Sequence, residues 1–269
     1  MLKECERRIL RYGSPGMGVL LSMLVLQPAG AATLCVNPSG SQGCYSTINA
    51  AVSAAHAHDG IKVAPGTYHE DVVIGKTISL IGTNSANTII DATGQPNGVY
   101  VDGLDNPGLS DVVVTGFTIQ NANFEGVLIT NASGVLVYRN VVRGNDKSLD
   151  ISTPACPGLP AFETAEDEDC GEGIHLVGAD HSTINNNTVQ ANSGGILLSD
   201  ETASTHDNLI SGNAVMNNPY DCGITLASHP PAQPGSPFGV MHNTVASNTS
   251  TTTDIWCRGR ARASAFLRF

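Results

Sequence analysis

The chain has 269 residues, of which 41% are hydrophobic, 5% aromatic and 14% charged, and it contains 29 glycines. Few charges and few aromatic side chains beside many glycines fit one domain made of turns and short aliphatic strands. From Ala32 to Cys257 there are 5 basic and 22 acidic residues, a net charge of 5 − 22 = −17, which argues against nucleic acid and anionic membranes as partners.

Residues 1–31 have the pattern of a secretory signal peptide. Four basic residues in the first eleven are followed by an apolar run at residues 19–26 and by Ala-Gly-Ala at residues 29–31. The apolar run is too short to cross a bilayer. We therefore expect an exported protein, periplasmic or extracellular, with no stable membrane insertion once the signal is removed.

Removal of the signal would leave an even number of cysteines, which favours disulfides in an oxidising compartment. Cys35 and Cys44 are expected to close a short loop near the mature start. A Cys156–Cys170 bridge would close the base of an insertion, although the sequence alone leaves the pairing of these two and of Cys222 and Cys257 open. No Cys/His spacing predicts a zinc site.

Residues 47–55 predict a short amphipathic helix, with Ser46 or Thr47 as its N-cap. Such a helix would cover the open apolar end of a repeat structure. Strand-like alternation follows at residues 61–63, 70–74 and 78–82.

Two short motifs then recur along the chain. One is a glycine followed by alternating aliphatic residues, and it begins at Gly98, Gly126, Gly173, Gly195 and Gly223, which are 28, 47, 22 and 28 residues apart. The other is Asn-x-Val, with Phe-Thr-Ile in its place upstream. A step of 22 residues is too short for a helical pair, so each segment is expected to be a short strand that pairs with the same strand of the next repeat. The prediction is a parallel β-solenoid.

Alternation along each strand predicts which side chains point inward. The outward row of the glycine strand is expected to contain Tyr100, Leu128, His175, Leu197 and Thr225. The inward row of the next strand is expected to contain Val114, Val137, Ile184, Ile210 and Val240. After a turn, the next inward row is expected to contain Ile119, Val142, Val189, Val215 and Val245. The turn itself is expected to hold Phe117, Asn140, Asn187, Asn213 and Asn243. An asparagine at this turn tolerates left-handed backbone, and stacked amides can hydrogen-bond from coil to coil.

These repeats resemble the right-handed parallel β-helix superfamily, which includes pectate lyases, pectin esterases and polygalacturonases. The helix followed by Val-x-Pro-Gly-Thr-Tyr-x-Glu at residues 63–70 is similar to the opening of pectin esterases. The resemblance covers roughly Cys35 to Asn248. It implies an all-β, right-handed parallel β-helix (β-solenoid) over residues 32–250 with a short N-terminal capping helix.

Two segments interrupt the repeat. An insertion of about 25 residues between Asn145 and Gly173 carries an acidic run that could be solvated or bind Ca²⁺ loosely. Residues 251–269 contain four arginines and no further repeat strand. We interpret this tail as atypical, and as a possible truncated or frameshifted end that sequencing of the downstream DNA would reveal.

The hallmark catalytic motifs of these enzymes are absent, so the resemblance implies no activity. The first hypothesis is that the protein binds a polysaccharide or cell-wall glycan on its sheet face. The alternative is a carbohydrate-active enzyme, a polysaccharide lyase or glycoside hydrolase acting on uronate polymers. A metallochaperone-like role is weakened because the sequence shows no cluster of methionines or histidines.

One set of side chains could carry chemistry if the repeats align as described. Its predicted catalytic residues are His175, Glu172, Asp200, Glu201 and Asp221, since carboxylates beside a histidine suit acid–base work on a glycan. The predicted substrate-binding residues are Tyr100, Thr225, His229, Arg139, Arg143 and Lys147. No metal ligands are assigned, and Ca²⁺ is the one cofactor considered.

Overall fold

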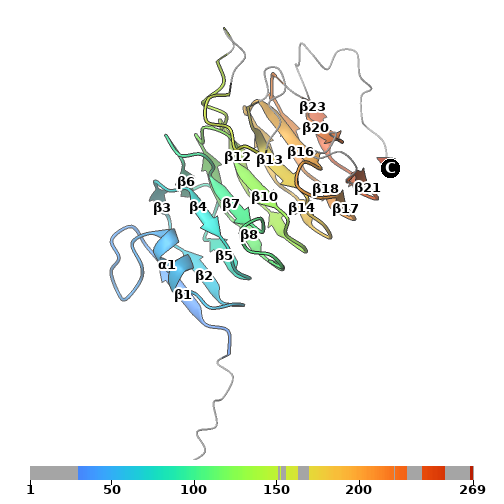
Figure 1. Cartoon of the computed structure of the whole chain (residues 1–269). Helices are drawn as coiled ribbons and strands as arrows, with labels where there is room; N and C mark the ends of the chain where they lie inside the picture. Colours follow the sequence, from blue (N-terminus) through green and yellow to red (C-terminus); the bar gives the residue numbers. More distant parts are fainter. Residues whose placement is uncertain are drawn as a thin grey trace, which may run out of the picture. The chain divides into compact units, whose positions relative to one another are not determined.

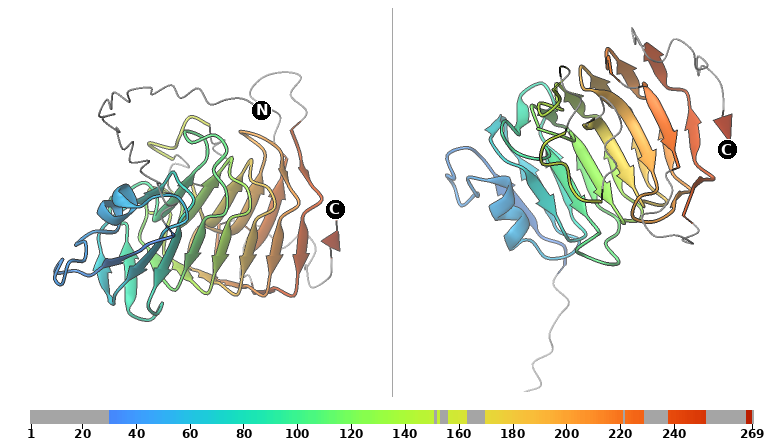
Figure 2. Two further views of the ribbon diagram at one scale, coloured as in Figure 1. Left: turned by 90° about the horizontal axis from the view of Figure 1, so that it is seen from below. Right: turned by 45° about the horizontal axis from the view of Figure 1, so that its top comes forward.

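The computed structural model describes residues 30–150, 152, 156–162, 170–220, 222–228, 238–251 and 267–268 of the chain. Within them the chain winds through successive coils, which add short strands to three stacked sheets (Figures 1 and 2). Almost all strand pairs are parallel, and the described helix has seven residues. The predicted all-β parallel β-helix is therefore confirmed.

Three sheets contain most of the strands. The nine-stranded sheet consists of β1 (Thr33–Val36), β2 (Gly60–Val63), β5 (Ser79–Gly82), β8 (Val113–Thr115), β11 (Leu136–Tyr138), β14 (Thr183–Asn185), β18 (Leu209–Ser211), β22 (Thr244–Ala246) and β24 (Leu267–Arg268). The six-stranded sheet consists of β4 (Val72–Ile74), β7 (Val99–Asp102), β10 (Val127–Thr130), β13 (Glu172–Val177), β16 (Gly194–Ser199) and β20 (Ile224–Ala227). The seven-stranded sheet consists of β3 (Gly66–Tyr68), β6 (Thr88–Asp91), β9 (Thr118–Gln120), β12 (Val141–Arg143), β15 (Thr188–Gln190), β19 (Ala214–Met216) and β23 (Thr249–Thr251). A fourth, smaller sheet joins β17 (Thr205–His206) to β21 (Val240–Met241).

The register stacks the predicted inward side chains above one another. In the six-stranded sheet Ile196 pairs with Ile174 on one side and with Ile224 on the other. In the nine-stranded sheet Ile184 pairs with Ile210, and both side chains are fully buried. Strands of three to six residues would not be stable alone, and here their aliphatic side chains form one continuous core.

The last described coil is shifted along the chain relative to the prediction. Val245, and not Val240, pairs with Ile210 in the nine-stranded sheet. Val240 pairs instead with Thr205 in the small β17–β21 sheet. The placement of Val240 is wrong because the Asn-x-Val motif does not identify a single corner. A coil has more than one corner at which an asparagine precedes a short alternation of aliphatic residues.

Asparagine side chains form hydrogen-bonded ladders at these corners. Asn187 Oδ1 accepts from the backbone N–H of Asn140 at 3.0 Å, and the Asn187 amide donates to Asn213 Oδ1 at 3.0 Å. This ladder continues to Asn248, whereas Asn243 lies in a different ladder. The predicted turn row is thus correct as far as Asn213 and wrong for Asn243. A third ladder comprises Asn145, Asn192 and Asn218.

The left-handed backbone at the corners belongs to the residue before each asparagine. Arg139, Asn186 and Ser247 have φ of 55°, 53° and 56°. The ladder asparagines, although asparagine tolerates left-handed backbone, do not have positive φ. Their conformation is set by the ladder, because each buried amide bonds to backbone groups of neighbouring coils.

The helix α1 (Ile48–Ala54) covers the first coil as expected. Thr47 is its N-cap, since the Thr47 side chain accepts from the Ala50 N–H at 3.2 Å. The face toward the core consists of Ile48, Ala51 and Val52. No helix in the described part of the chain is long and apolar enough to cross a bilayer.

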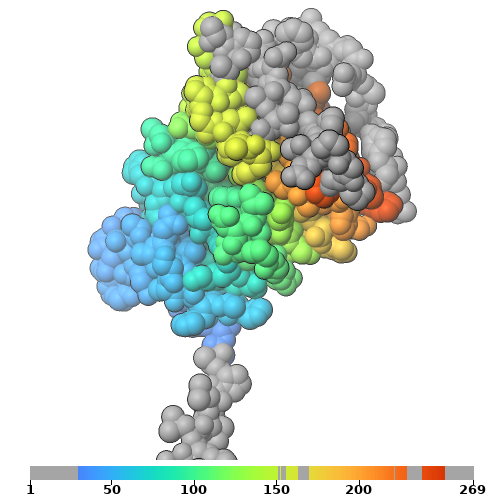
Figure 3. Space-filling model, in the orientation of Figure 1, coloured from blue at the N-terminus to red at the C-terminus, as the bar shows by residue number. Residues whose placement is uncertain are grey.

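The two expected disulfides are confirmed. One joins Cys35 to Cys44 near the start of the first coil, and the other joins Cys156 to Cys170 at the base of the insertion. The described residues 156–162 of that insertion stand out from the stacked coils (Figures 1 and 3). Cys222 is also disulfide-bonded. Cys257 lies outside the described residues, as do residues 1–29 of the predicted signal and residues 252–266 of the predicted tail.

The outer face of the six-stranded sheet is not the open surface that the sequence predicts. The predicted row itself is present, because the strand register pairs its members in order: Tyr100, Leu128, His175, Leu197 and Thr225. However, Leu128, His175 and Leu197 are only 1%, 3% and 7% exposed. Alternation decides which face of a strand a side chain occupies, but it does not describe what packs over that face.

Candidate functional site

Several polar side chains meet around His175 on the outer face of β13. His175 Nε2 lies 2.7 Å from Ser199 Oγ, at the end of β16. His175 Nδ1 lies 3.3 Å from Glu125 Oε1 and 3.6 Å from Glu172 Oε2. Ser199 Oγ also contacts the Glu201 carboxylate. We call these five residues the His175 cluster.

Successive coils supply the members of this cluster. Glu172 begins β13 and lies on the same strand as His175, while Glu125 lies just before β10 in the preceding coil. Glu125 Oε2 accepts from the backbone N–H of Glu172 at 2.7 Å, which holds the Glu125 carboxylate against the imidazole. Because coils stack about 4.8 Å apart, groups distant in sequence come within hydrogen-bond distance.

The contacts form a serine–histidine–carboxylate chain. With a proton on Nδ1, His175 donates to Glu125, while the one proton of the Ser199 hydroxyl is directed either to His175 Nε2 or to the Glu201 carboxylate, since Ser199 Oγ contacts both. A histidine oriented in this way can act as a general base toward a serine oxygen. Access is restricted, however, because His175 is 3% exposed and Ser199 is fully buried. A substrate reaches Ser199 only if the groups that cover it move.

The same cluster has a donor set that could hold a metal ion. Glu125, Glu172 and His175 each offer a ligand atom, and these atoms lie within 4.8 Å of one another. An imidazole with carboxylates suits Zn²⁺ or another transition metal, whereas Ca²⁺ prefers oxygen ligands alone. The Ca²⁺ considered from the sequence depended on the acidic run, of which residues 163–169 lie outside the described residues.

A pocket of about 370 Å³ with both polar and apolar lining lies beside the His175 cluster. Its lining comes from corners of three coils, within residues 145–149, 191–193 and 217–220. The Asp146 N–H donates to the carbonyl of Phe124, the neighbour of Glu125, at 3.0 Å. On the other side, Ser193 precedes Gly194, the register partner of Glu172. Pocket and cluster are therefore neighbours.

Some lining residues form the wall of the pocket and others are available to a ligand. The amides of Asn145 and Asn192 are hydrogen-bonded to each other in their ladder. Lys147 and Asn217 are exposed, and Tyr220 is half-buried. The pocket therefore offers an ammonium group, an amide and a phenol ring.

The structure brings only part of the predicted catalytic set together. Glu172, His175 and Glu201 are in the cluster. Asp200 is fully buried and accepts a hydrogen bond from Ser228 Oγ at 2.8 Å. Asp221 and the predicted binding residue His229 lie outside the described residues.

The predicted binding residues are scattered over the coils. Lys147 lines the pocket. The Tyr100 hydroxyl lies 3.1 Å from Thr130 Oγ1, and burial raises the pKa of the Tyr100 phenol well above its usual value. Thr225 is half-buried in β20.

Neither of the two predicted arginines lines the pocket. The Arg143 guanidinium donates to Gln120 Oε1 at 3.0 Å and 3.2 Å. The Arg139 guanidinium lies 5.8 Å from the centre of the Tyr138 ring. Both groups therefore have protein partners on their own coils or the coil next to them.

Sequence reasoning missed Glu125 and Ser199. Glu125 directly precedes Gly126, as Glu172 directly precedes Gly173, so a comparison of that position across the repeats could have found it. Ser199 carries no such signal. It reaches His175 diagonally from the next coil, since its own register partner is Val177.

Fold and site together define a parallel β-helix protein with a polar site at the side of its coils. The sequence matches the family model described as "Right handed beta helix region" over residues 77–264, so the chain belongs to that family. The resemblance inferred from the repeats is thus confirmed.

Solved structures with similarity to this chain include pectin methylesterases. The carrot enzyme is 12% identical, with 85% of each chain covered and a TM-score of 0.41. The Erwinia chrysanthemi enzyme PemA is 12% identical over 84% of this chain and 68% of its own, with a TM-score of 0.44. The Aspergillus niger enzyme is 14% identical over 89% and 92%, with a TM-score of 0.35. No curated protein matches the sequence. At these identities and scores, no activity is carried over to this chain.

Proposed function

We propose that this protein is exported and binds a neutral polysaccharide in the pocket beside the His175 cluster. The observation that carries the proposal is the construction of the pocket from corners of three coils. Because such corners repeat about every 4.8 Å, the pocket extends along the stack, as a site for a chain of sugars requires. Its volume of about 370 Å³ lies in the usual range of ligand sites.

The chemistry of the pocket suits hydroxyl-rich ligands. The Tyr220 ring offers an apolar face to sugar C–H groups and a polar hydroxyl at its tip. Lys147 donates hydrogen bonds, and the Asn217 amide both donates and accepts them. The net charge of −17 between Ala32 and Cys257 repels uronate polymers at long range, so a neutral glycan is favoured.

The binding surface proposed here is the pocket and not the flat sheet face. Leu128, His175 and Leu197 are buried in the middle of that face, so a polymer cannot lie directly on them. The pocket, in contrast, has exposed polar groups and lies at the edge of the same sheet.

Export is supported by two independent features. The described residues contain the disulfides Cys35–Cys44 and Cys156–Cys170, which persist in oxidising compartments. The pattern of residues 1–31 is that of a cleaved secretory signal. Mass spectrometry of the protein recovered outside the cytoplasm should give a mature start near Ala32. Recovery only from the cytoplasm with an intact leader would contradict export.

A hydrolytic enzyme is the second candidate, favoured by the Ser199–His175–Glu125 contacts. Ser199 Oγ would attack the carbonyl carbon of a glycan ester and pass its proton to His175 Nε2. That proton would then go to the departing alcohol, and water would release the acyl group from Ser199. The full burial of Ser199 makes this candidate the weaker one.

A single glycan panel tests both candidates. The exported protein is applied to an array of neutral and acidic polysaccharides, and the bound glycans are assayed for released acid, reducing ends and unsaturated products. We expect binding to a neutral glycan that weakens at least tenfold in Tyr220→Ala and in Lys147→Ala. Tyr138→Ala and Lys62→Ala, which remove the same side-chain types outside the pocket, should bind normally.

Binding that persists in both pocket variants, or no binding to any glycan, would overturn the proposal. Product release that is lost in Ser199→Ala and His175→Gln, with binding retained, would instead establish the hydrolytic candidate. Circular dichroism of every variant confirms that the β-helix is intact.

A further inference from the structure

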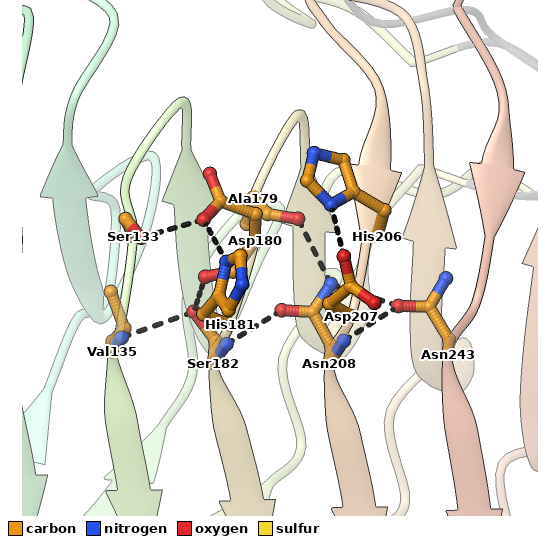
Figure 4. Close-up of polar contacts among 10 residues, drawn as sticks. All are labelled: Ser133, Val135, Ala179, Asp180, His181, Ser182, His206, Asp207, Asn208 and Asn243. Carbon is orange, nitrogen blue, oxygen red and sulfur yellow. Dashed lines mark hydrogen bonds and ion pairs between the residues drawn. The ribbon is translucent and has the colours of Figure 1, made fainter.

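Three histidines, His181, His206 and His242, lie at one corner of successive coils, and the rings of the first two are in contact. One corner position is equivalent in three successive coils. It is occupied by His181, Asp207 and His242, whose backbones have φ of 50°, 55° and 55°. Each directly precedes a member of one hydrogen-bonded ladder, which consists of Ser182, Asn208 and Asn243 (Figure 4). His206, one residue before Asp207, belongs to the adjacent row and pairs with Met241.

Carboxylates orient two of these imidazoles. His181 Nδ1 lies 2.6 Å from Asp180 Oδ1, and His206 Nδ1 lies 2.8 Å from Asp207 Oδ2 (Figure 4). Asp180 is itself fixed by a hydrogen bond of 2.6 Å from Ser133 Oγ. A carboxylate that accepts from Nδ1–H leaves the lone pair of the imidazole on Nε2, which is the arrangement found behind histidines that bind metals.

Asp207 lies between the histidines of neighbouring coils. Its carboxylate accepts from His206 Nδ1 at 2.8 Å, and the strand register places Asp207 between His181 of the preceding coil and His242 of the next. The corner therefore combines one carboxylate with imidazoles from three coils.

The spacing of the rings suits a shared ion. The ring centres of His181 and His206 are 5.9 Å apart, with an angle of 81° between the ring planes. Two imidazoles bound to one Zn²⁺ at about 2.1 Å have ring centres roughly 5–6 Å apart. The side chains of His181 and His206 are 64% and 35% exposed, so an ion in the solvent can reach both rings.

We propose that His181, His206 and His242 form a surface site for a divalent transition-metal ion such as Zn²⁺, with Asp207 neutralising its charge. Imidazole donors favour Zn²⁺, Cu²⁺ and Ni²⁺ over Ca²⁺ and Mg²⁺, which prefer oxygen. The site is independent of the polysaccharide pocket and does not require it.

Titration calorimetry of the exported, tag-free chain with ZnCl₂ at pH 7.5 tests the proposal. We expect one ion per chain at this corner, and at least tenfold weaker binding in each of His181→Ala, His206→Ala and His242→Ala. Affinity should fall from pH 7.5 to pH 5.5 because protonated imidazoles do not bind metals. CaCl₂ should give no heat that depends on these histidines.

Two control variants separate this corner from other histidines. His58→Ala removes an imidazole elsewhere on the surface, and His175→Gln removes the one in the buried cluster. Both should leave the affinity of the corner for Zn²⁺ unchanged. Zn²⁺ binding that is lost in His175→Gln but retained in the three corner variants would overturn the proposal, as would the absence of any binding.

Discussion

Single residues have distinct roles at the corners of the coils. The buried asparagines bond to backbone groups of the neighbouring coil, as Asn187 does to the N–H of Asn140 and the carbonyl of Val137. The residue before each asparagine makes the turn, and Arg139 and Ser247 show that side chains other than glycine are tolerated there. Removal of a ladder amide would leave buried backbone groups without partners, which typically costs about 1–3 kcal/mol for each.

At this scale we predict a pH-dependent effect for Asp71. Burial raises the pKa of the Asp71 carboxyl to about 6, although a hydrogen bond from the Asn97 backbone opposes the shift. The folded chain therefore favours the protonated carboxyl, and this contribution is complete below about pH 4 and is lost as the pH rises through about 6. Asp71→Asn, which is neutral throughout, should equal the native chain below pH 4. It should be more stable above pH 6, by at most about 3 kcal/mol.

Thermal melts between pH 3.5 and 8 measure this difference. Asp105→Asn is the control, because Asp105 is exposed. Equal melting temperatures for Asp71→Asn and the native chain at pH 8 would contradict the assignment.

At the scale of an element, alternation along a strand correctly predicts which side chains lie in the core. The sequence predicts that Ile196→Asp is severe and that Leu197→Asp is mild. The register agrees, since Ile196 pairs with the core residues Ile174 and Ile224. The expected mildness of Leu197→Asp is wrong, however, because Leu197 is only 7% exposed on the covered outer face. Both substitutions should therefore be destabilising.

A matched pair in β18 is a better test of the register. Ile210 is fully buried, whereas its neighbour Leu209 is 38% exposed. Ile210→Asp places an unpaired charge in the core and should cost several kcal/mol, comparable with the stability of a whole domain. Leu209→Asp should cost under about 1 kcal/mol. Urea unfolding followed by circular dichroism compares them, and the opposite order would mean that the register is slipped by one residue.

At the scale of the whole molecule, stability depends on the end of the stack as well as on its core. Each coil contacts only its neighbours, so the first coil needs the cover of α1 and the Cys35–Cys44 bridge. Replacement of both cysteines by serine should lower the free energy of unfolding by about 2–3 kcal/mol, the usual effect of opening a short loop. Native protein in reducing agent should be destabilised at least as much in denaturant titrations, because reduction also opens the Cys156–Cys170 bridge. An unchanged midpoint in the double variant would show that the bridge does not stabilise the cap.

The sequence by itself determined the fold class, the capping helix, the Cys35–Cys44 disulfide and most of the inward rows, whereas the Cys156–Cys170 pairing needed the structure. These features depend on local pattern: alternation with a period of two, glycine and asparagine at turns, and repetition in one register. The same pattern was ambiguous at the last coil, where Asn243 and Asn248 belong to different ladders and only Asn243 precedes an aliphatic residue at the inward position.

Only the tertiary structure decided how the side chains of different coils combine. Glu125 and His175 are 50 residues apart in sequence but lie in adjacent coils. The three histidines of the corner form no cluster in the sequence, yet stacking brings them to one face. The burial of the outer row of the six-stranded sheet also could not be predicted from the strands. Alternation along a strand defines its two faces, but the surrounding loops determine which face is exposed to solvent.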